Sequence, residues 1–376
     1  MRTSGLRDLL NATAPKRAQP PRTPVTLITG FLGSGKTTLL NSALRAPTMR
    51  GALVVVNEFG AVGLDHKLVS HSSDNILVLE NGCLCCTVFG DLLGEMSRLY
   101  HRREANEIPT FDRVLIETSG LADPTSLIQA FLSDPVLSGL YQLTATITLI
   151  DSANYLSTLD RHDEAVRQIA LADHLILTKL DLASDAQRPQ IRAQLERLLR
   201  TLNPRAAIHA ADARDLDWEA LFRWRAYDPA RSSSEALLWL GAVAVDSTGH
   251  SPAGHHKHFD SNHLQVSSYS FVREDPLPRL ALQLLLQGVE QNLGPNLLRF
   301  KAIVNVEDET NGPAVIHGAQ HLLHNMTWLD HWPFPDRKSR FVLIAAGIRT
   351  GPLGEMIDLL DRIAWRSAKA RQSKTT

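Results

Sequence analysis

The most informative stretch of this chain is Gly30-Phe31-Leu32-Gly33-Ser34-Gly35-Lys36-Thr37, which has the pattern G-x-x-x-x-G-K-[ST]. It stands between an apolar run, residues 25–29, and a segment with helical spacing, residues 38–44. In such a phosphate-binding loop (P-loop), backbone N–H groups and the positive end of a helix surround phosphate oxygens. A glycine-rich turn without a ligand is the alternative. The pattern predicts these nucleotide-binding residues: Gly33, Ser34, Gly35, Lys36, Thr37 and Thr38.

Two of these residues have specific expected roles. Lys36 is expected to reach the β- and γ-phosphates, which makes it a candidate catalytic residue. Thr37 is expected to hold Mg²⁺ through its hydroxyl.

Composition limits the class of protein. The 376 residues predict two domains, and 44% apolar residues are enough for a core in each. A formal net charge of −1 gives no overall field that would attract nucleic acid or an anionic membrane. The sequence has no apolar run of about 18 residues, the length that a membrane-spanning helix needs. We therefore expect a soluble protein with neither nucleic acid nor membrane as a partner.

Apolar runs alternate with segments of helical spacing from residue 25 onward, which predicts an α/β fold. The predicted sheet is mostly parallel, with helices on both faces, and binds its ligand at the carboxyl ends of its strands. Strands are expected near 25–29, 52–57, 75–79, 113–117, 144–150, 174–178 and 206–209. Helices are expected near 36–45, 90–105, 124–133, 162–172, 185–201 and 216–223.

Four segments are predicted along the chain. Residues 1–23 are basic and contain prolines, which predicts a disordered tail or, alternatively, an organelle-targeting segment. Residues 24–225 form the predicted P-loop domain. Residues 226–263 are a His-rich linker, interpreted either as a weak zinc-collecting loop or as a solvated linker. Residues 264–376 form a second, smaller domain.

The second domain mixes strands and helices without strict alternation, which predicts an α+β domain with helices on one face of its sheet. Strands are expected near 264–272, 297–306, 313–318 and 340–346, and helices near 277–291 and 354–365. His317 falls in a predicted strand, so this histidine and its neighbours His321 and His324 are interpreted as surface residues rather than ligands.

Two acidic segments follow predicted strands. Asn57-Glu58-Phe59-Gly60 ends the second strand, and the later Asp65 is a candidate catalytic residue that contacts the metal through water; a solvated carboxylate is the alternative. Glu117-Thr118-Ser119-Gly120 ends the fourth strand. Glu117 is expected to orient a magnesium-bound water, and Gly120 to offer its N–H to the γ-phosphate.

The sixth strand ends in Thr178-Lys179-Leu180-Asp181, a pattern that favours guanine. Asp181 can accept hydrogen bonds from the two N–H donors on one edge of guanine, and the Lys179 stem can lie along the ring face. Adenine lacks that donor pair and would leave the carboxylate without partners. The predicted nucleotide is therefore GTP, bound in part by Thr178, Lys179 and Asp181.

All three cysteines lie in one short segment, at Cys83, Cys85 and Cys86. A chain otherwise without cysteine is typical of a reduced, cytoplasmic protein. Thiolates at this spacing can bind Zn²⁺ and leave one position of a tetrahedral shell open, which suits a metal that is handed on. A redox switch and inert buried thiols are the alternatives.

Together these motifs resemble the CobW-like metallochaperone group of P-loop GTPases. The resemblance rests, in family order, on the P-loop, Asn57-Glu58-Phe59-Gly60, Cys83-x-Cys85-Cys86, Glu117-Thr118-Ser119-Gly120 and Thr178-Lys179-Leu180-Asp181. It continues into the second domain through Leu298-Arg299-Phe300-Lys301 and Ser339-Arg340-Phe341-Val342. Two departures are Ala61, where many members have an acid, and Thr178, where Asn is commoner.

The resemblance implies a GTP-dependent protein that delivers metal to a client metalloprotein, with zinc the commonest cargo and cobalt or iron in some branches. Lys36, Thr37 and Glu117 inherit nucleotide and magnesium roles, and the three cysteines inherit the role of metal ligands. The second domain is expected to recognise the client, and a homodimer is compatible with this interpretation. Two rival functions are a small-molecule P-loop kinase or ATPase and a non-catalytic metal sensor or store.

Overall fold

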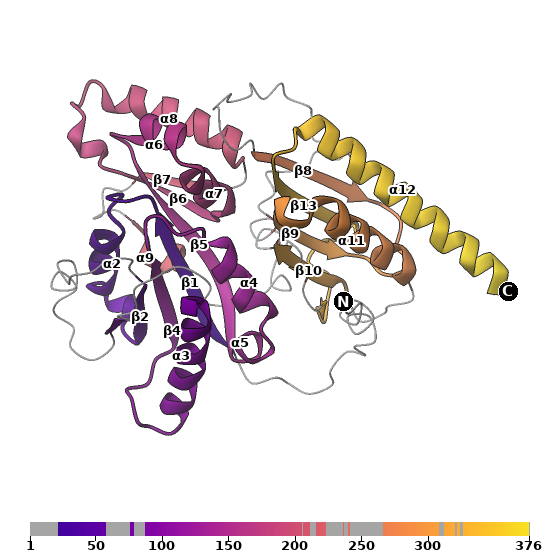
Figure 1. Cartoon of the computed structure of the whole chain (residues 1–376), viewed down its shortest axis with the longest axis horizontal. Helices are drawn as coiled ribbons and strands as arrows, with labels where there is room; N and C mark the ends of the chain where they lie inside the picture. The colour runs from indigo at the N-terminus through magenta and orange to yellow at the C-terminus, as the bar shows by residue number, and fades with distance from the viewer. Residues whose placement is uncertain are drawn as a thin grey trace. The chain divides into compact units, whose positions relative to one another are not determined.

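The computed structural model divides into two compact units, which consist mainly of Pro21–Ala226 and Leu264–Thr376 (Figure 1). The structure describes residues 22–57, 76–78, 87–204, 206–210, 216–222, 236, 240, 266–307, 312–319, 322–323 and 326–375. No helix within these ranges combines the length and apolar character that a bilayer crossing requires.

The first unit is built on a seven-stranded sheet in which all neighbouring strands run parallel. Its order is β3-β2-β4-β1-β5-β6-β7. The strands are β1 (Thr23–Gly30), β2 (Ala52–Asn57), β3 (Ile76–Val78), β4 (Arg113–Thr118), β5 (Tyr141–Asp151), β6 (His174–Thr178) and β7 (Ala207–Ala210). The P-loop therefore leaves from the carboxyl end of β1, between β4 and β5.

Helices connect these strands. They are α2 (Lys36–Leu44), α3 (Thr87–Glu104), α4 (Thr125–Ser133), α5 (Pro135–Leu140), α6 (Tyr155–Arg161), α7 (Asp163–Leu171), α8 (Arg188–Leu202) and α9 (Trp218–Leu221), with the short 3₁₀ turns η1 (Pro47–Met49) and η3 (Leu180–Leu182).

Strand β1 is buried on both sides, as its run of apolar and β-branched residues requires. Ile28 belongs to a core that includes Leu39 and Leu40 of α2, and Leu27 points to the opposite face because side chains alternate along a strand. Helix α7 packs near β1 and β5, and α4 packs near β5. The position of the P-loop is fixed by this fully packed central strand.

The second unit contains an antiparallel sheet in the order β11-β10-β9-β13-β8, with β12 paired to β10. Its strands are β8 (Val266–Arg273), β9 (Leu297–Val304), β10 (Ala314–Ala319), β11 (Leu322–Leu323), β12 (Thr327–Trp328) and β13 (Ser339–Ala346). Its helices are α11 (Arg279–Leu293) and α12 (Thr350–Thr375), with the 3₁₀ turn η4 (Gly294–Asn296).

Alternating residues of this second sheet enter two different cores. Ala302, Ile316 and Leu343 pack in the core that contains residues of α11 and α12. Ile303 and Val342, one residue along their strands, pack with Phe334 in a separate cluster. The two helices thus cover one face of the sheet, which is the arrangement that the sequence predicts.

The predicted fold class is confirmed, and the differences lie in short or polar elements. The helices α5 and α6 were not predicted, since each spans only two turns or fewer between longer elements. Helix α5 begins at Pro135 because Asp134 caps it, accepting hydrogen bonds from the N–H groups of Val136 and Leu137 at 2.9 Å. Helix α12 continues to Thr375, ten residues past the predicted end, through a polar segment of good helix formers.

Candidate functional site

Glycines shape the P-loop. Gly33 and Gly35 have φ angles of +70° and +93°, a region that disfavours residues with a Cβ. A Cβ on Gly30 would lie 2.6 Å from the carbonyl oxygen of Leu149 on β5. Gly35 also forms the N-cap of α2 without any side-chain cap from the described residues, so the first N–H groups of the helix face the loop. This cradle fits a phosphate group.

Lys36 lies in the first turn of α2 and is only 7% exposed. Its Nζ donates hydrogen bonds to the carbonyl oxygens of Gly30 at 3.0 Å and Phe31 at 3.3 Å. The ammonium group is therefore held at the start of the P-loop, where a bound phosphate can take over these contacts.

The side chains of Thr37 and Glu117 contact each other near the carboxyl end of β4, beside the P-loop. The Thr37 hydroxyl donates to Glu117 Oε1 at 2.7 Å, and Glu117 is 1% exposed. The contact follows from sheet order, because β4 lies beside β1 with Ile28 in register with Glu117. A hydroxyl and a carboxylate are oxygen ligands of the kind that Mg²⁺ prefers, so this donor set fits the expected metal.

The segment after β4 packs directly on the P-loop. A Cβ on Gly120 would lie 2.7 Å from the backbone nitrogen of Leu32, so only glycine permits this approach. The N–H of Ala122 donates to the carbonyl oxygen of Ser119 at 3.0 Å, which closes a turn over residues 119–122. This turn, called the β4 turn below, sits where a γ-phosphate sensor is expected.

The segment expected to recognise the base is tied to the P-loop through Thr178. Its hydroxyl lies 2.8 Å from the carbonyl oxygen of Ser34 and 3.0 Å from that of Ile150, within donating distance of both. The next residue, Lys179, adopts a left-handed conformation with φ of +59°. Asp181 is exposed in η3, where its carboxylate is open to a ligand.

Lys179 has a carboxylate partner on β5. Its Nζ donates to Asp151 Oδ2 at 2.9 Å. Burial raises the pKa of the Asp151 carboxyl, but hydrogen bonds from Lys179, Asn154 and Ala153 outweigh burial and leave the pKa below its ordinary value. Asp151 is therefore an anion at neutral pH that fixes the Lys179 side chain beside the expected base.

Family models match both units of the chain. Residues 24–210 match the CobW/HypB/UreG nucleotide-binding domain, and residues 266–359 match the cobalamin synthesis protein cobW C-terminal domain. The chain belongs to the CobW family of P-loop GTPases.

Among the relatives of this CobW-family chain is the zinc chaperone YjiA of Escherichia coli, which is 31% identical over 325 residues, covering 86% of this chain and 94% of YjiA. Zinc-regulated GTPase metalloprotein activator 1 of Schizosaccharomyces pombe is 30% identical over 287 residues, which cover 72% of this chain and 66% of the yeast protein. The crystal structure of Zn(II)-bound YjiA GTPase shares the fold, with a TM-score of 0.62, 24% identity and coverage of 91% and 99% of the two chains.

Several predicted site residues lie outside the described ranges. These are Asp65 and the three cysteines Cys83, Cys85 and Cys86, together with most of residues 226–263. Among the residues that the structure does describe, no group of three or more His, Cys, Asp or Glu side chains could hold a metal ion. The zinc site at the cysteine segment of this CobW-family protein stays a prediction.

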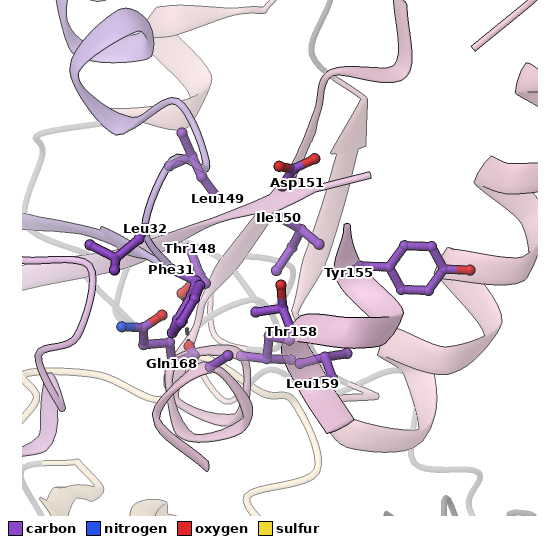
Figure 2. Close-up of a pocket in the computed structure, with 12 residues that line it drawn as sticks. Phe31, Leu32, Thr148, Leu149, Ile150, Asp151, Tyr155, Thr158, Leu159 and Gln168 are labelled. Carbon is purple, nitrogen blue, oxygen red and sulfur yellow. Dashed lines mark hydrogen bonds between the residues drawn. The ribbon is translucent and has the colours of Figure 1, made fainter. Parts of the chain in front are cut away.

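Sequence reasoning overlooked two polar residues near the nucleotide site of this CobW-family chain. Asp151 is the last residue of β5, at the same edge of the sheet as the P-loop. This position at a strand end is the feature from which a role at the site could have been predicted. Gln168 lies on α7 among the buried residues Ala165, Val166 and Ile169, where an apolar side chain is expected. Gln168 and Asp151 line a pocket beside Phe31 of the P-loop (Figure 2).

Proposed function

We propose that this GTPase metallochaperone binds zinc through Cys83, Cys85 and Cys86 and transfers it to a client metalloprotein in a nucleotide-dependent way. Relatives that are named zinc chaperones and a zinc-regulated GTPase activator support the zinc cargo. Reduced cysteines suit a cytoplasmic protein.

The observation that carries the proposal is the direction of β3. This strand runs parallel to β2, with Val54 in register with Ile76, and β2 runs parallel to β4. The carboxyl ends of β1, β3 and β4 therefore lie along the same edge of the sheet. Residues 79–86, which contain every cysteine, join the carboxyl end of β3 to the start of α3 at Thr87. Strands β2 and β4 lie between β3 and β1, so we propose that a change at the γ-phosphate reaches this segment along that edge of the sheet.

The residues around the P-loop support the proposal of GTP hydrolysis, because several of them could contact the phosphates or Mg²⁺. Lys36 would contact the β- and γ-phosphates, Gly120 N–H would meet the γ-phosphate, and Thr37 with Glu117 would hold Mg²⁺. That ion, when bound, neutralises charge on the β- and γ-oxygens. Asp65 would add a contact through water. At the other end, Asp181 would accept from the guanine edge, with Lys179 along the ring.

In the proposed cycle, GTP binding orders the segments around Asp65 and around the cysteines, and hydrolysis relaxes them. The metal then passes by ligand exchange to cysteines or histidines of the client, which the second unit would recognise. Residues 226–263 would collect zinc weakly through their histidines. The two nucleotide states must hold zinc differently, because a ligand shifts an equilibrium only through its differential affinity for the two states.

The test is zinc transfer from purified protein to a chromogenic chelator, measured with a non-hydrolysable GTP analogue and with GDP. We expect about one tightly bound zinc and a transfer rate that differs between the two nucleotides. The variant Cys83→Ser/Cys85→Ser/Cys86→Ser should lose this zinc. The matched control His255→Asn/His256→Asn/His258→Asn removes three histidines and should keep it. Equal transfer in both nucleotide states, or tight zinc in the cysteine variant, would refute the proposal.

A nucleotide competition assay separates this function from a small-molecule kinase or ATPase. The guanine contact predicts that GDP displaces a fluorescent guanine nucleotide and that ADP does not. An ATPase would bind ATP at least as well as GTP and would keep its activity without the cysteines.

A further inference from the structure

A buried amide on α7 is bonded to the β4 turn. Gln168 is 0% exposed, and its backbone carbonyl accepts a hydrogen bond from the Thr148 hydroxyl on β5 at 2.8 Å. This contact ties the residue to the strand that borders the P-loop. A glutamine at a fully buried helical position needs hydrogen-bond partners within the protein. Among the described residues the Gln168 Nε2 has two acceptors and its Oε1 has no partner, so the partners of Nε2 indicate what the side chain does.

Its side chain reaches the segment that carries the expected γ-phosphate contact. Nε2 donates to the carbonyl oxygens of Gly120 at 3.2 Å and Ala122 at 2.9 Å. Both acceptors belong to the β4 turn, so the two donor hydrogens of one amide hold two points of the same turn. Figure 2 shows this side chain beside Phe31, so the amide lies close to the P-loop as well.

The β4 turn is thus held from two sides. Gly120 packs on the Leu32 backbone, where even a Cβ would be too close at 2.7 Å, and Gln168 anchors the carbonyls of Gly120 and Ala122 from α7. Fixing the carbonyl of Gly120 restricts the ψ angle of this residue, and the P-loop contact restricts its location. Together they fix the position of Gly120 and the peptide plane that follows it, which limits the directions open to the N–H in the preceding plane.

We propose that Gln168 is a positioning residue that holds the β4 turn in the geometry in which the Gly120 N–H meets the γ-phosphate. Helix α7 then takes part in distinguishing GTP from GDP, although none of its side chains needs to touch the nucleotide. This inference rests on the proposed use of the Gly120 N–H. It adds a residue that the nucleotide-binding motifs do not contain.

A matched control is offered by Asn203, which caps the carboxyl end of α8 and contacts the carboxyl end of α7. Asn203 is also a buried amide, 1% exposed, and its Nδ2 donates to the carbonyl oxygens of Ile169, Ala170 and Ala172. These bonds satisfy the carboxyl end of α7 and do not reach the β4 turn. Loss of this amide should lower stability through α7 without moving the γ-phosphate contact.

The experiment compares the wild type with Gln168→Met, Gln168→Glu and Asn203→Ala. Met keeps the length of the side chain without its hydrogen bonds, and Glu keeps the shape but presents acceptors to the two carbonyls. For each protein we would measure the melting temperature, kcat for GTP hydrolysis and the affinities for Mg²⁺-GDP and for a non-hydrolysable GTP analogue. A variant that fails to fold is replaced in the comparison by the other Gln168 variant.

We expect both Gln168 variants to lose about 10²-fold in kcat, the cost typical of a misplaced contact, and about tenfold in analogue affinity relative to GDP. Asn203→Ala should keep the wild-type ratio of the two affinities at a comparable loss of melting temperature. A Gln168 variant that keeps this ratio while its melting temperature falls as in Asn203→Ala would overturn the inference. Equal zinc transfer from the wild type in the two nucleotide states would instead overturn the nucleotide switch in the proposed function, so the two failures are distinguishable.

Discussion

The proposed phosphate side and the proposed base side of the nucleotide site differ in how many of their contacts are already formed in the structure without ligand. On the phosphate side, Lys36 is 7% and Glu117 is 1% exposed, and the surrounding loops approach so closely that glycines are required. On the base side, Asp181 is exposed and its neighbour Leu182 is 70% exposed. The phosphate side is preorganised, whereas the base side presents one open carboxylate. Hydrolysis should therefore depend on many contacts and base selectivity on few.

The largest effect is expected at Lys36. Lys36→Ala removes the only charge that the P-loop motif itself supplies to the β- and γ-phosphates and should lower kcat/KM for GTP by at least about 10³-fold. The measurement is phosphate release under saturating Mg²⁺. Lys338→Ala, which removes a lysine paired with Glu274 in the second unit, is the control and should hydrolyse GTP like the wild type. Equal rates for the two variants would contradict a phosphate-side origin of catalysis.

Gly120→Ala tests whether close packing on the phosphate side matters. The added methyl group would lie 2.7 Å from the Leu32 nitrogen, so the β4 turn must shift away from the P-loop. We expect kcat to fall about 10²-fold with GDP affinity nearly unchanged. Gly139→Ala on α5 is the control, because among the described residues no atom beyond its chain neighbours and its own helix backbone lies within 4 Å of the added Cβ. Wild-type kcat in Gly120→Ala would show that the turn is not held in place for catalysis.

Asp181→Asn tests the open base side. Loss of the carboxylate removes charge-assisted hydrogen bonds to the guanine edge and should weaken GTP binding by about 10- to 100-fold, with a shift of preference toward xanthine nucleotides. Competition of GTP, XTP and ATP against a fluorescent nucleotide measures this shift. The kcat for XTP should approach the wild-type kcat for GTP, since the phosphate side is intact. Unchanged preference would place base recognition elsewhere.

Asp151→Asn should have a smaller effect, because it removes an ion pair of which Lys179 is 35% exposed. We expect a loss of about threefold in GTP affinity and no change in kcat at saturation. Titration of wild type and variant with a fluorescent GTP analogue measures the difference. A loss as large as that of Asp181→Asn would mean that Lys179 placement, rather than the Asp181 carboxylate, dominates base binding.

The smallest expected effect is the pH dependence of this ion pair. The pKa of Asp151 is lower in the folded protein than its ordinary value of about 3.9, so its contribution to stability is present above that pH. It is lost as the pH falls through the lower pKa of the folded state. The melting temperatures of wild type and Asp151→Asn should therefore differ at pH 6 and converge as the pH falls below about 3.9. A difference that grows on acidification would reverse the assigned sign.

Local motifs made most of the phosphate side predictable. The P-loop, Glu117 and Gly120 lie at strand ends within short patterns, so their shared location follows from a parallel sheet. The contacts of Gln168 with Gly120, Thr178 with Ser34 and Asp151 with Lys179 join residues far apart in the chain. The spacing of residues in the sequence does not predict such pairs, because these contacts depend on strand order and on how deeply each helix packs against the sheet. Helices α5 and α6 were missed because each is too short for a periodic pattern.

The central claim is that nucleotide and zinc binding are linked through one edge of one sheet. Linkage is reciprocal, so the affinity for the GTP analogue must change with zinc by the same factor as zinc affinity changes with the analogue. The direct measurement is calorimetric titration of Mg²⁺-GTP analogue into the protein with and without one equivalent of zinc, repeated with GDP. We predict a zinc-dependent change of at least about fivefold for the analogue and a smaller one for GDP. Identical analogue affinity with and without zinc would contradict the account.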